Sequence, residues 1–333
     1  MPIQHASDFL FIYEASQCNP NGDPDQENKP RMDYDTKTNL VTDTRVKRFI
    51  RDYIKSINDE EAIFVDMEGN SKVSVDSKLK AVVKRTVENL GALEKAFSGN
   101  TEALNVYRDI ISQSKGNAEE VWKTVTDKKF KHKEVNYELL AYLVKEKFID
   151  IRMFGSAFAV GGFTKAYTGP IQMNWGYSLN KVELMDSSSI VTIMNDDSST
   201  FGKDYRVHYS LLALNGTINA QAAKTTGLEE ADVATFRDAL WQSIPASPTR
   251  SKLNQYPKLY VEIQYQQGIS NGQFGDLRNF VSTTPQEGIS DKQVRRFTDL
   301  VFDAQPLKEL VANHRDVIKE VIVKTSPDVQ FSV

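Results

Sequence analysis

The chain contains a single cysteine, Cys18, among 333 residues. One cysteine excludes an intrachain disulfide and favours the reducing cytoplasm. Long apolar runs are also missing: no stretch of about 18 apolar residues, the length that a transmembrane helix needs, occurs in the sequence. The N-terminus lacks the basic region, apolar segment and cleavage site of a secretory signal. We therefore expect a cytoplasmic protein that does not insert into a membrane.

Glycine motifs that bind phosphate are absent as well. Neither GxxxxGK[ST] nor GxGxxG occurs, although several glycines lie close together, at Gly155, Gly161, Gly162, Gly169 and Gly176. Such glycines usually form turns and bulges. The alternative is a close approach of the backbone to a ligand, in which case Lys165 would face an anion.

Composition and charge leave the choice of partner open. The apolar fraction of 40% and the charged fraction of 26% are those of an ordinary globular protein, and the length favours one core with large insertions. The net charge of −4 says little, because screening over roughly 8 Å makes a partner respond to local charge. Basic residues cluster in 45–55, 72–85 and 123–133.

A strand, a long loop and an amphipathic helix are predicted near the N-terminus. Residues 8–15 form an apolar run typical of a buried strand, and the prolines, asparagines and glycine of 19–30 then exclude regular structure. Asp43 is the candidate N-cap of the helix. Its buried stripe comprises Val46, Phe49, Ile50, Tyr53, Ile54 and Ile57.

The opposite face of this helix carries a cationic stripe. Its members are Lys47, Arg48, Arg51 and Lys55, interrupted by Asp52. Like charges one turn apart repel by a few tenths of a kcal/mol per pair, so an anion such as a phosphate backbone would stabilise the stripe. A solvated helix face is the alternative.

Acidic side chains in the loop are candidate ligands for a divalent metal that hydrolyses phosphodiesters; they are Asp23, Asp25, Asp33 and Asp35. If Asn19 is the first ligand of a calcium loop, Pro24 falls where the motif requires glycine. Aspartates beside proline and glycine more often cap and turn the backbone. We therefore expect no metal site.

The rest of the chain divides into a helical block and a β-rich block. Residues 58–147 are predicted to be mostly helical, and FIDIRMFGSAFA then begins the strands. A protruding hairpin is expected within 185–206, a strand at 258–266 and helix at 290–324. Alternating core residues are expected at Ile171, Met173, Trp175 and Tyr177, and a helical core stripe at Val233, Phe236, Leu240 and Ile244. This order fits an α+β fold with a ferredoxin-like core, as in many RNA-binding domains, although the aromatic RNP consensus is absent.

Several segments together resemble one family. They are NPNGDPDQENKPRMDYDT, LVTDTRVKRFIRDYI, RMFGSAFAV, TGPIQMNWGYSLNKV and PTRSKLNQYPKL. In this order they are similar to the Cas7 family, the backbone subunit of the type I CRISPR surveillance complexes called Cascade, and most similar to the type I-B members of the Csh2 group. The resemblance spans essentially the whole chain.

The resemblance implies a three-part architecture. A ferredoxin-like, RRM-like palm with C-terminal helices would comprise 1–59 and 148–333, helical fingers 60–147, and a β-hairpin thumb 187–206. Copies of such a subunit polymerise along CRISPR RNA, and the thumb displaces a base at regular intervals. Met194, Phe201 and Tyr205 are candidate wedges for this step, with plain hairpin packing as the alternative.

The basic helix, a glycine-containing palm loop and a TRS segment correspond to RNA-binding parts of that family. The expected RNA-binding residues are Asn21, Arg45, Lys47, Arg48, Arg51, Gly161, Gly162, Thr164, Lys165, Gln172, Met194, Tyr205, Arg206, Arg250 and Ser251.

The resemblance further implies a protein that is not an enzyme and needs no cofactor. Its partners would be CRISPR RNA, target DNA that pairs with this RNA, neighbouring copies of itself, and Cascade subunits of the Cas5, Cas6, Cas8 and small-subunit types. Two alternatives remain: a type III-like backbone subunit that cleaves target RNA through a loop aspartate, and a protein scaffold that binds no RNA.

Overall fold

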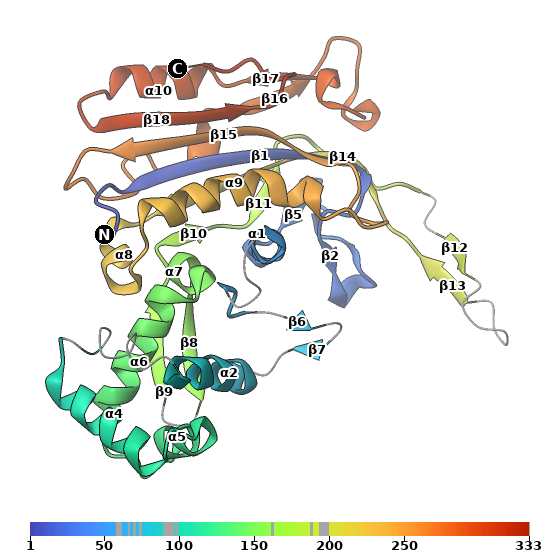
Figure 1. The fold of residues 1–333 in the computed structure, drawn as a ribbon. Coiled ribbons are helices and arrows are strands. Elements are labelled where there is room, and N and C mark those ends of the chain that lie inside the picture. The colour runs from blue at the N-terminus through green and yellow to red at the C-terminus, as the bar shows by residue number, and fades with distance from the viewer. Residues whose placement is uncertain are drawn as a thin grey trace. The chain divides into compact units, whose positions relative to one another are not determined.

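The computed structural model describes residues 1–57, 62–65, 67–68, 71–72, 75–88, 97, 99–160, 163–186, 189–192 and 200–332 (Figure 1). The chain divides into two compact units. We call them the sheet unit, which comprises Gln4–Tyr53, Ile171–Asn219 and Thr235–Val333, and the helical unit, which comprises Met1–Ile3, Ile54–Pro170 and Ala220–Ala234. Among the described residues, no helix is long and apolar enough to span a bilayer.

The sheet unit is built on one antiparallel sheet. Eight strands follow the order β18-β15-β1-β14-β11-β5-β4, with β10 paired to β14. Their bounds are β1 Ser7–Cys18, β4 Met32–Asp33, β5 Thr38–Val41, β10 Ile171–Met173, β11 Gly176–Ser178, β14 Val207–Ile218, β15 Gln255–Tyr265 and β18 Ile318–Thr325. Strand β1 lies between β14 and β15, so both of its edges are hydrogen-bonded. This central position suits its apolar sequence, SDFLFIYEASQC.

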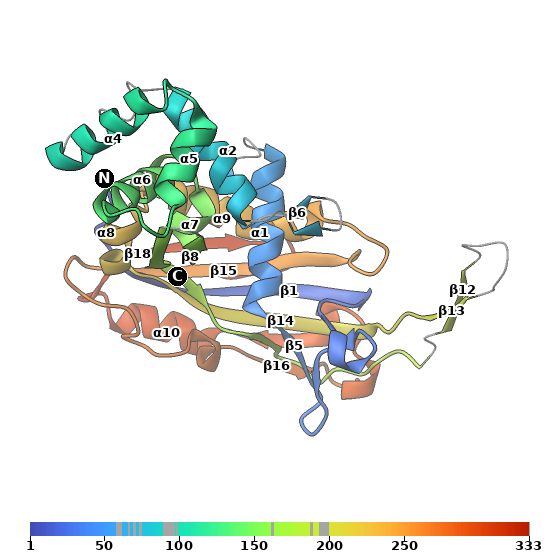
Figure 2. The ribbon, with the colours of Figure 1, turned by 90° about the horizontal axis from the view of Figure 1, so that it is seen from below.

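Two helices cover one face of this sheet. Helices α1 (Asp43–Ile57) and α9 (Glu230–Ala246) lie on the same side of β1 (Figures 1 and 2). Phe236 of α9 meets Phe9 edge to face, with ring centroids 5.5 Å apart. The predicted core stripe of α9 is confirmed, because Val233, Phe236, Leu240 and Ile244 are all buried. Helix α10 (Gln305–Asn313) and the hairpin of β16 (Ser282–Pro285) and β17 (Leu300–Asp303) lie on the opposite side (Figure 1).

Helix α1 has the amphipathic character that the sequence predicts, but a different cap. Val46, Phe49, Ile50 and Ile54 are buried, whereas Ile57 at the helix end is 54% exposed. The prediction of Asp43 as N-cap is wrong: Thr42 Oγ1 accepts a hydrogen bond from Arg45 N at 3.2 Å, and Asp43 is the first helical residue. The threonine hydroxyl, one residue earlier, accepts from one of the backbone N–H groups that have no carbonyl partner in the first turn of the helix.

The segment between β1 and α1 is more ordered than its composition predicts. Two short ladders form, one between β2 (Gly22–Asp23) and β3 (Lys29–Pro30) and one between β4 and β5. The loop aspartates turn the backbone, since Asp23 accepts from Asp25 N at 3.2 Å and Asp33 accepts from Asp35 N at 3.0 Å. The capping interpretation of these carboxylates therefore describes their contacts in the structure.

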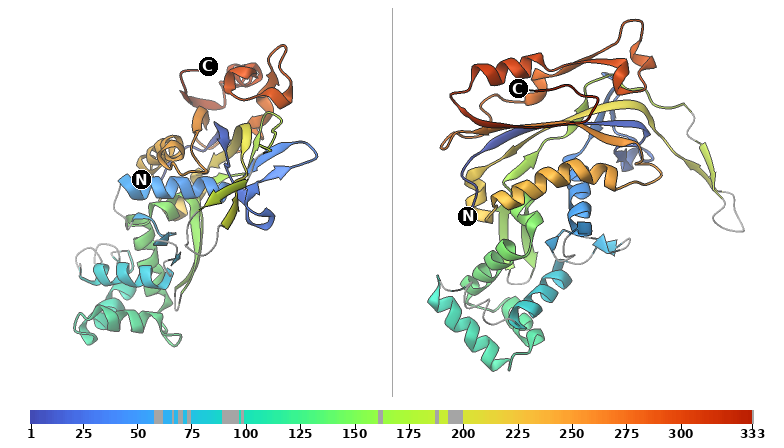
Figure 3. Two further views of the ribbon diagram at one scale, coloured as in Figure 1. Left: turned by 90° about the vertical axis from the view of Figure 1, so that its right-hand side faces the viewer. Right: turned by 45° about the horizontal axis from the view of Figure 1, so that its top comes forward.

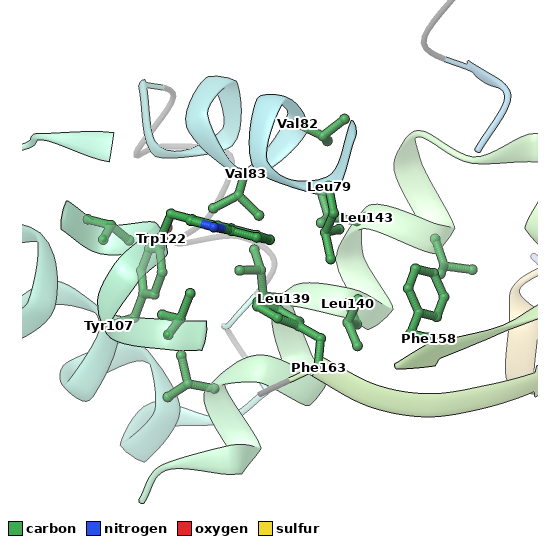
Figure 4. Packing of buried hydrophobic residues seen from close by; sticks show 14 of the residues in the cluster. Leu79, Val82, Val83, Tyr107, Trp122, Leu139, Leu140, Leu143, Phe158 and Phe163 are labelled. Atoms are coloured by element: carbon green, nitrogen blue, oxygen red, sulfur yellow. The ribbon is translucent and has the colours of Figure 1, made fainter. Parts of the chain in front are cut away.

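The helical unit packs helices against a two-stranded ladder. Its helices are α2 Val75–Glu88, α4 Thr101–Gln113, α5 Ala118–Thr126, α6 Lys133–Glu146, α7 Ile149–Phe154 and α8 Ala220–Thr226, and its ladders pair β8 (Gly155–Val160) with β9 (Phe163–Thr168) and β6 (Met67–Glu68) with β7 (Ser71–Lys72). In its core, Trp122 stacks on Phe163 with centroids 5.8 Å apart (Figure 4). Leu139 and Leu143 of α6 fill the space beside them (Figure 4).

This core extends past the end of the predicted insertion. Phe148, Ile151, Phe158, Phe163 and Tyr167 belong to the same buried cluster as the residues of α2, α5 and α6. The compact unit therefore continues to Pro170, whereas the sequence predicts that the palm resumes at residue 148. Shared burial of apolar side chains, which composition does not reveal, sets the boundary.

Three local predictions are wrong. Residues 149–154 are helical instead of extended, and the helix ends at Gly155, whose φ of 74° suits a glycine C-cap. The region 290–324 contains only one α-helix among its described residues, α10, and Ile318–Thr325 forms β18 at the edge of the sheet. Trp175 is 45% exposed instead of buried, because it lies in the connection between β10 and β11.

The predicted hairpin is present as a two-stranded ladder. Strands β12 (Ser189–Thr192) and β13 (Thr200–Lys203) pair antiparallel, with Ser189 opposite Lys203. The ladder projects beyond the end of the main sheet (Figure 3). Residues 193–199, and with them the candidate wedge Met194, lie outside the described residues.

Candidate nucleic-acid interface

The cationic stripe of α1 is partly neutralised by its own helix. Lys47 Nζ lies 2.9 Å from Asp43 Oδ2, and Arg48 Nε donates to Asp52 Oδ2 at 2.9 Å. The Lys47 side chain is only 13% exposed, and that of Arg48 29%. Arg51 is also partly exposed. The two salt bridges therefore relieve the repulsion that the sequence predicts among these cations. The i, i+4 spacing of the partners in each salt bridge is visible in the sequence and indicates both pairs.

Asn21 holds the loop to the start of α1. Its Oδ1 accepts from Thr42 N at 2.9 Å and from Thr42 Oγ1 at 3.0 Å. Its backbone oxygen accepts from Arg31 N at 2.9 Å. The contacts that the structure gives to Asn21 thus position α1 relative to the end of β1.

Asp204 joins two predicted arginines where β13 leads into β14. Arg206 Nη2 lies 2.7 Å from Asp204 Oδ2, and Arg250 Nη2 lies 3.0 Å from the same oxygen. Arg206 also donates to the backbone oxygens of Gln17 and Arg250, at 2.9 and 3.2 Å. The Ser251 backbone oxygen accepts from Asn19 N at 2.9 Å. The structure therefore gathers Arg206, Arg250 and Ser251 at the end of β1.

A second carboxylate ties the hairpin base to the loop. Glu27 Oε2 accepts from Lys203 Nζ at 2.9 Å and from Tyr205 Oη at 3.0 Å. These donors lower the pKa of Glu27, the hydrogen bond from Lys203 being the largest cause. Lys29 Nζ lies 5.0 Å from the centroid of the Tyr205 ring. Tyr205 and Lys203 thus contact the loop through Glu27.

The remaining predicted residues are divided between the two units. Thr164 and Lys165 lie on β9 of the helical unit, where Lys165 Nζ is 5.0 Å from the Tyr167 ring centroid and 5.7 Å from that of Tyr137. Gln172 is an exposed residue of β10 in the sheet unit. Gly161 and Gly162 fall outside the described residues.

The other glycines of the cluster approach protein backbone and side chains. A Cβ on Gly155 would lie 2.2 Å from Tyr167 O, and one on Gly169 would lie 2.0 Å from the Phe154 carbonyl carbon. A Cβ on Gly176 would lie 2.6 Å from Val41 Cγ1. The interpretation that these three glycines allow tight turns and close packing within the protein therefore accounts for their positions.

Two groups near this interface were not predicted from the sequence. Lys252 follows the TRS segment directly, and its ammonium donates to the Asn19 backbone oxygen. The guanidinium of Arg31 lies 5.7 Å from the centroid of the exposed Trp175 ring. The basic TRSK sequence was a signal for Lys252, whereas the contact between Arg31 and Trp175 joins segments that are far apart in the chain.

Within the described part of the chain, which includes all of 19–41, no three His, Cys, Asp or Glu side chains are grouped to hold a metal ion. Asp23 instead lies 3.5 Å from Arg31. Arginine, lysine and tyrosine side chains at this face can bind anions and aromatic rings.

Comparison with known proteins gives the family. The family model for CRISPR-associated protein Cas7 matches residues 5–305. A CRISPR-associated protein Cas7 from Haloferax volcanii is 29% identical over 326 residues, covering 96% of this chain and 86% of the relative. A solved chain titled "CRISPR RNA-guided surveillance complex, pre-nicking" has a TM-score of 0.51 at 12% identity, covering 98% of this chain and 94% of that chain.

A second solved chain, titled "CRISPR RNA-guided surveillance complex", has a TM-score of 0.40 at 13% identity, covering 80% of this chain and 78% of that chain. This likeness is too weak to carry an argument, and the likeness to the first solved chain concerns the fold alone. The family match spans most of the sequence, and the chain therefore belongs to the CRISPR-associated protein Cas7 family.

Proposed function

We propose that this protein is a backbone subunit of a type I-B Cascade surveillance complex. Its copies polymerise along CRISPR RNA in the cytoplasm and present the spacer for base pairing with target DNA in antiviral defence. The Cas7 family match over residues 5–305 carries the proposal, and the fold of a chain from an RNA-guided surveillance complex supports it. Other Cascade subunits, of the Cas5, Cas6, Cas8 and small-subunit types, are its further partners.

The strand order supports a ferredoxin-like palm. Along the chain, β1, α1, β11, β14, α9 and β15 follow the βαββαβ order of that fold. In the sheet these strands lie in the order β15-β1-β14-β11. Helix α1 connects β1 to β11, and helix α9 connects β14 to β15. Each helix therefore joins two parallel strands that have one antiparallel strand between them. In this proposal the helical unit forms the fingers and the β12–β13 ladder forms the thumb.

RNA is held by its phosphates in this proposal. The candidate cations of the sheet unit come from three segments: α1, the β13–β14 connection and the TRSK segment. Several are paired with Asp43, Asp52 or Asp204, so a phosphate has to compete with these carboxylates. Binding is therefore expected to depend strongly on salt, as counterions are released.

Replacing Lys47, Arg48 and Arg51 together with alanine is expected to weaken binding of single-stranded RNA at least about tenfold. The slope of log affinity against log salt should fall by about 2, because each lost phosphate contact removes roughly 0.7. Fluorescence anisotropy over a salt series measures both. The matched control replaces Lys292, Arg315 and Lys319, which are exposed cations of the sheet unit. Equal affinity and slope in both triple variants would refute a role of the stripe in RNA binding.

The protein acts without breaking bonds in this proposal, which is supported by the carboxylates of Asp23 and Asp33: both accept from backbone N–H groups of their own turns, and Asp23 also pairs with Arg31. Incubating the assembled complex with complementary RNA and Mg²⁺ is expected to leave the RNA intact. Cleavage at regular spacing that disappears on Asp23→Ala or Asp33→Ala would establish the ribonuclease alternative. A chain that purifies without nucleic acid, judged by its ultraviolet absorbance ratio, would favour the protein-scaffold alternative.

A further inference from the structure

Strand β18 forms one edge of the main sheet. It pairs with β15 on one side, and none of the described strands pairs with its other side (Figure 1). Ser326 N donates to Lys258 O at 2.9 Å, and this bond fixes the phase of the ladder, because the residues that bond to a given neighbour alternate along an antiparallel strand. Counted back from Ser326, the backbone N–H and C=O groups of Val323 and Val321 point away from β15. These outward groups form a row to which another strand can add.

The side chains along this edge are unusually apolar for an exposed strand. Val321, Ile322 and Val323 follow one another, and each is partly exposed. Edge strands of soluble proteins are usually short or carry proline and many charges, because a long apolar edge associates with other chains. Strand β18 has eight residues and contains no proline. Two of its charges, Glu320 and Lys324, flank the apolar centre.

Glu320, Ile322 and Lys324 face the side of the sheet on which α9 lies. Lys324 Nζ lies 5.1 Å from the centroid of the Trp241 ring of α9, and alternate residues of a strand share one face. Glu320 and Lys324 are both exposed. They lie about 13 Å apart along their own strand, which is too far for a salt bridge between them. Lys324 Nζ is 3.9 Å from Asp238, but both side chains are about half exposed, so this ion pair is weak.

A second copy of β18 fits this edge in one antiparallel register. With a two-fold axis at Ile322, Glu320 lies opposite Lys324 of the second copy, and Lys324 lies opposite its Glu320. Ile322 meets its own counterpart, and Val321 exchanges backbone hydrogen bonds with Val323 of the second copy. A shift of the axis by one residue in either direction places Glu320 or Lys324 opposite Ile322. The charges therefore select both the partner and the register.

We propose that β18 is a self-complementary edge at which two copies of this chain join their sheets, with Ile322 on the two-fold axis. Such a contact uses the same surface on both copies, so it closes at two. Repetition along an RNA strand requires a head-to-tail contact instead, because the strand has a direction. The β18 contact is therefore separate from the polymerisation in the proposed function, and none of the expected RNA-binding residues lies on β18. Pairing of two edge strands buries little area, so the dimer is weak.

Charge reversal tests the register. The dissociation constant of the dimer is measured by sedimentation equilibrium on the full chain freed of nucleic acid. Glu320→Lys and Lys324→Glu each bring like charges together at both ends of the pairing, so each variant alone is expected to raise this Kd at least about tenfold. An equimolar mixture of the two variants should dimerise again, because each chain then meets opposite charges in the other. Glu287→Lys makes the same charge change at an exposed position of the sheet unit and should keep the wild-type Kd.

Cross-linking tests the position of the axis. In the proposed register the two Ile322 residues form a non-hydrogen-bonded pair with Cα atoms about 4.5 Å apart, which suits a disulfide. Ile322→Cys is therefore expected to give a covalent dimer on mild oxidation. Two copies of Glu320→Cys would lie at least about 13 Å apart and should not cross-link. The natural Cys18 is buried, so it contributes no background.

Each experiment has a result that overturns the proposal. A wild-type chain that stays monomeric over the whole concentration series refutes the dimer, and charge-reversal variants that dimerise like the wild type refute the register. A mixture of the two variants that stays monomeric also refutes the register, because a folding defect or a different surface would give that result. An Ile322→Cys chain that cross-links no faster than Glu320→Cys refutes the position of the axis. Neither experiment includes RNA, so its result is independent of the proposed function.

Discussion

Replacing Arg237 with methionine is expected to lower the free energy of unfolding of the sheet unit by about 3–5 kcal/mol. Glu262 of β15 is fully buried, and Arg237 of α9 donates to it through Nε at 2.7 Å and Nη2 at 2.8 Å. Without the guanidinium, this carboxylate keeps the hydroxyls of Ser7 and Tyr260 as donors, at 2.7 and 2.6 Å, but loses its counter-ion. A buried charge without compensation is among the most destabilising changes in a protein.

Chemical denaturation, combined with hydrogen exchange of peptides from β1 and β15, measures this loss within the sheet unit. Arg315→Met, which removes an exposed arginine of the same unit, should change stability by less than about 0.5 kcal/mol. The double variant Arg237→Met and Glu262→Met should regain most of the loss, because it removes both charges. A single Arg237→Met variant as stable as the wild type would show that the pair contributes little.

Replacing Gly155 with alanine is expected to destabilise the helical unit by about 2–5 kcal/mol. The backbone of Gly155, at φ 74° and ψ 174°, lies in a region that is essentially restricted to glycine and costs alanine roughly 1–3 kcal/mol, and overpacking adds roughly 1–3 kcal/mol. The new Cβ would lie 2.2 Å from Tyr167 O and 2.4 Å from Gly169 N. Both obstacles are backbone atoms, so they cannot move aside without disturbing the β8–β9 ladder.

Gly116 provides a matched control in the same unit, with φ +73° and no other group within 4 Å of the position that a Cβ would take. Gly116→Ala should therefore show only the conformational cost, roughly 1–2 kcal/mol. Hydrogen exchange in α6, whose Leu139 and Leu143 are fully buried, reports the stability of this unit. Equal losses in the two variants would mean that the close approach at Gly155 is relieved by small backbone shifts.

The sequence predicts best where one local pattern decides the structure. The apolar run of β1 and the core stripe of α9 follow from periodicity, and both are found buried. The ordered motifs from residue 19 to 259 resemble the family, and the family match agrees. These features depend on neighbours a few residues away, which the sequence displays directly.

Segments with weaker patterns were settled by the sheet and by the core. Ile318–Thr325 is a strand because the edge of β15 offers hydrogen bonds along its length, and tertiary context readily overrides a helical preference. Phe148 to Tyr167 joined the helical unit because its aromatic side chains complete that core. Neither outcome can be read from a single segment, because each needs a partner from elsewhere in the chain.

For the candidate interface, the sequence by itself determined which segments carry positive charge: α1, the end of the hairpin and the TRSK segment. Only the tertiary structure decided which of these charges are already compensated. Asp204 is paired with both Arg206 and Arg250, whereas the ammonium of Lys252 donates to the backbone oxygen of Asn19, more than 200 positions earlier in the sequence. The physical reason is that electrostatic energy depends on distance and burial in space, and folding alone sets both.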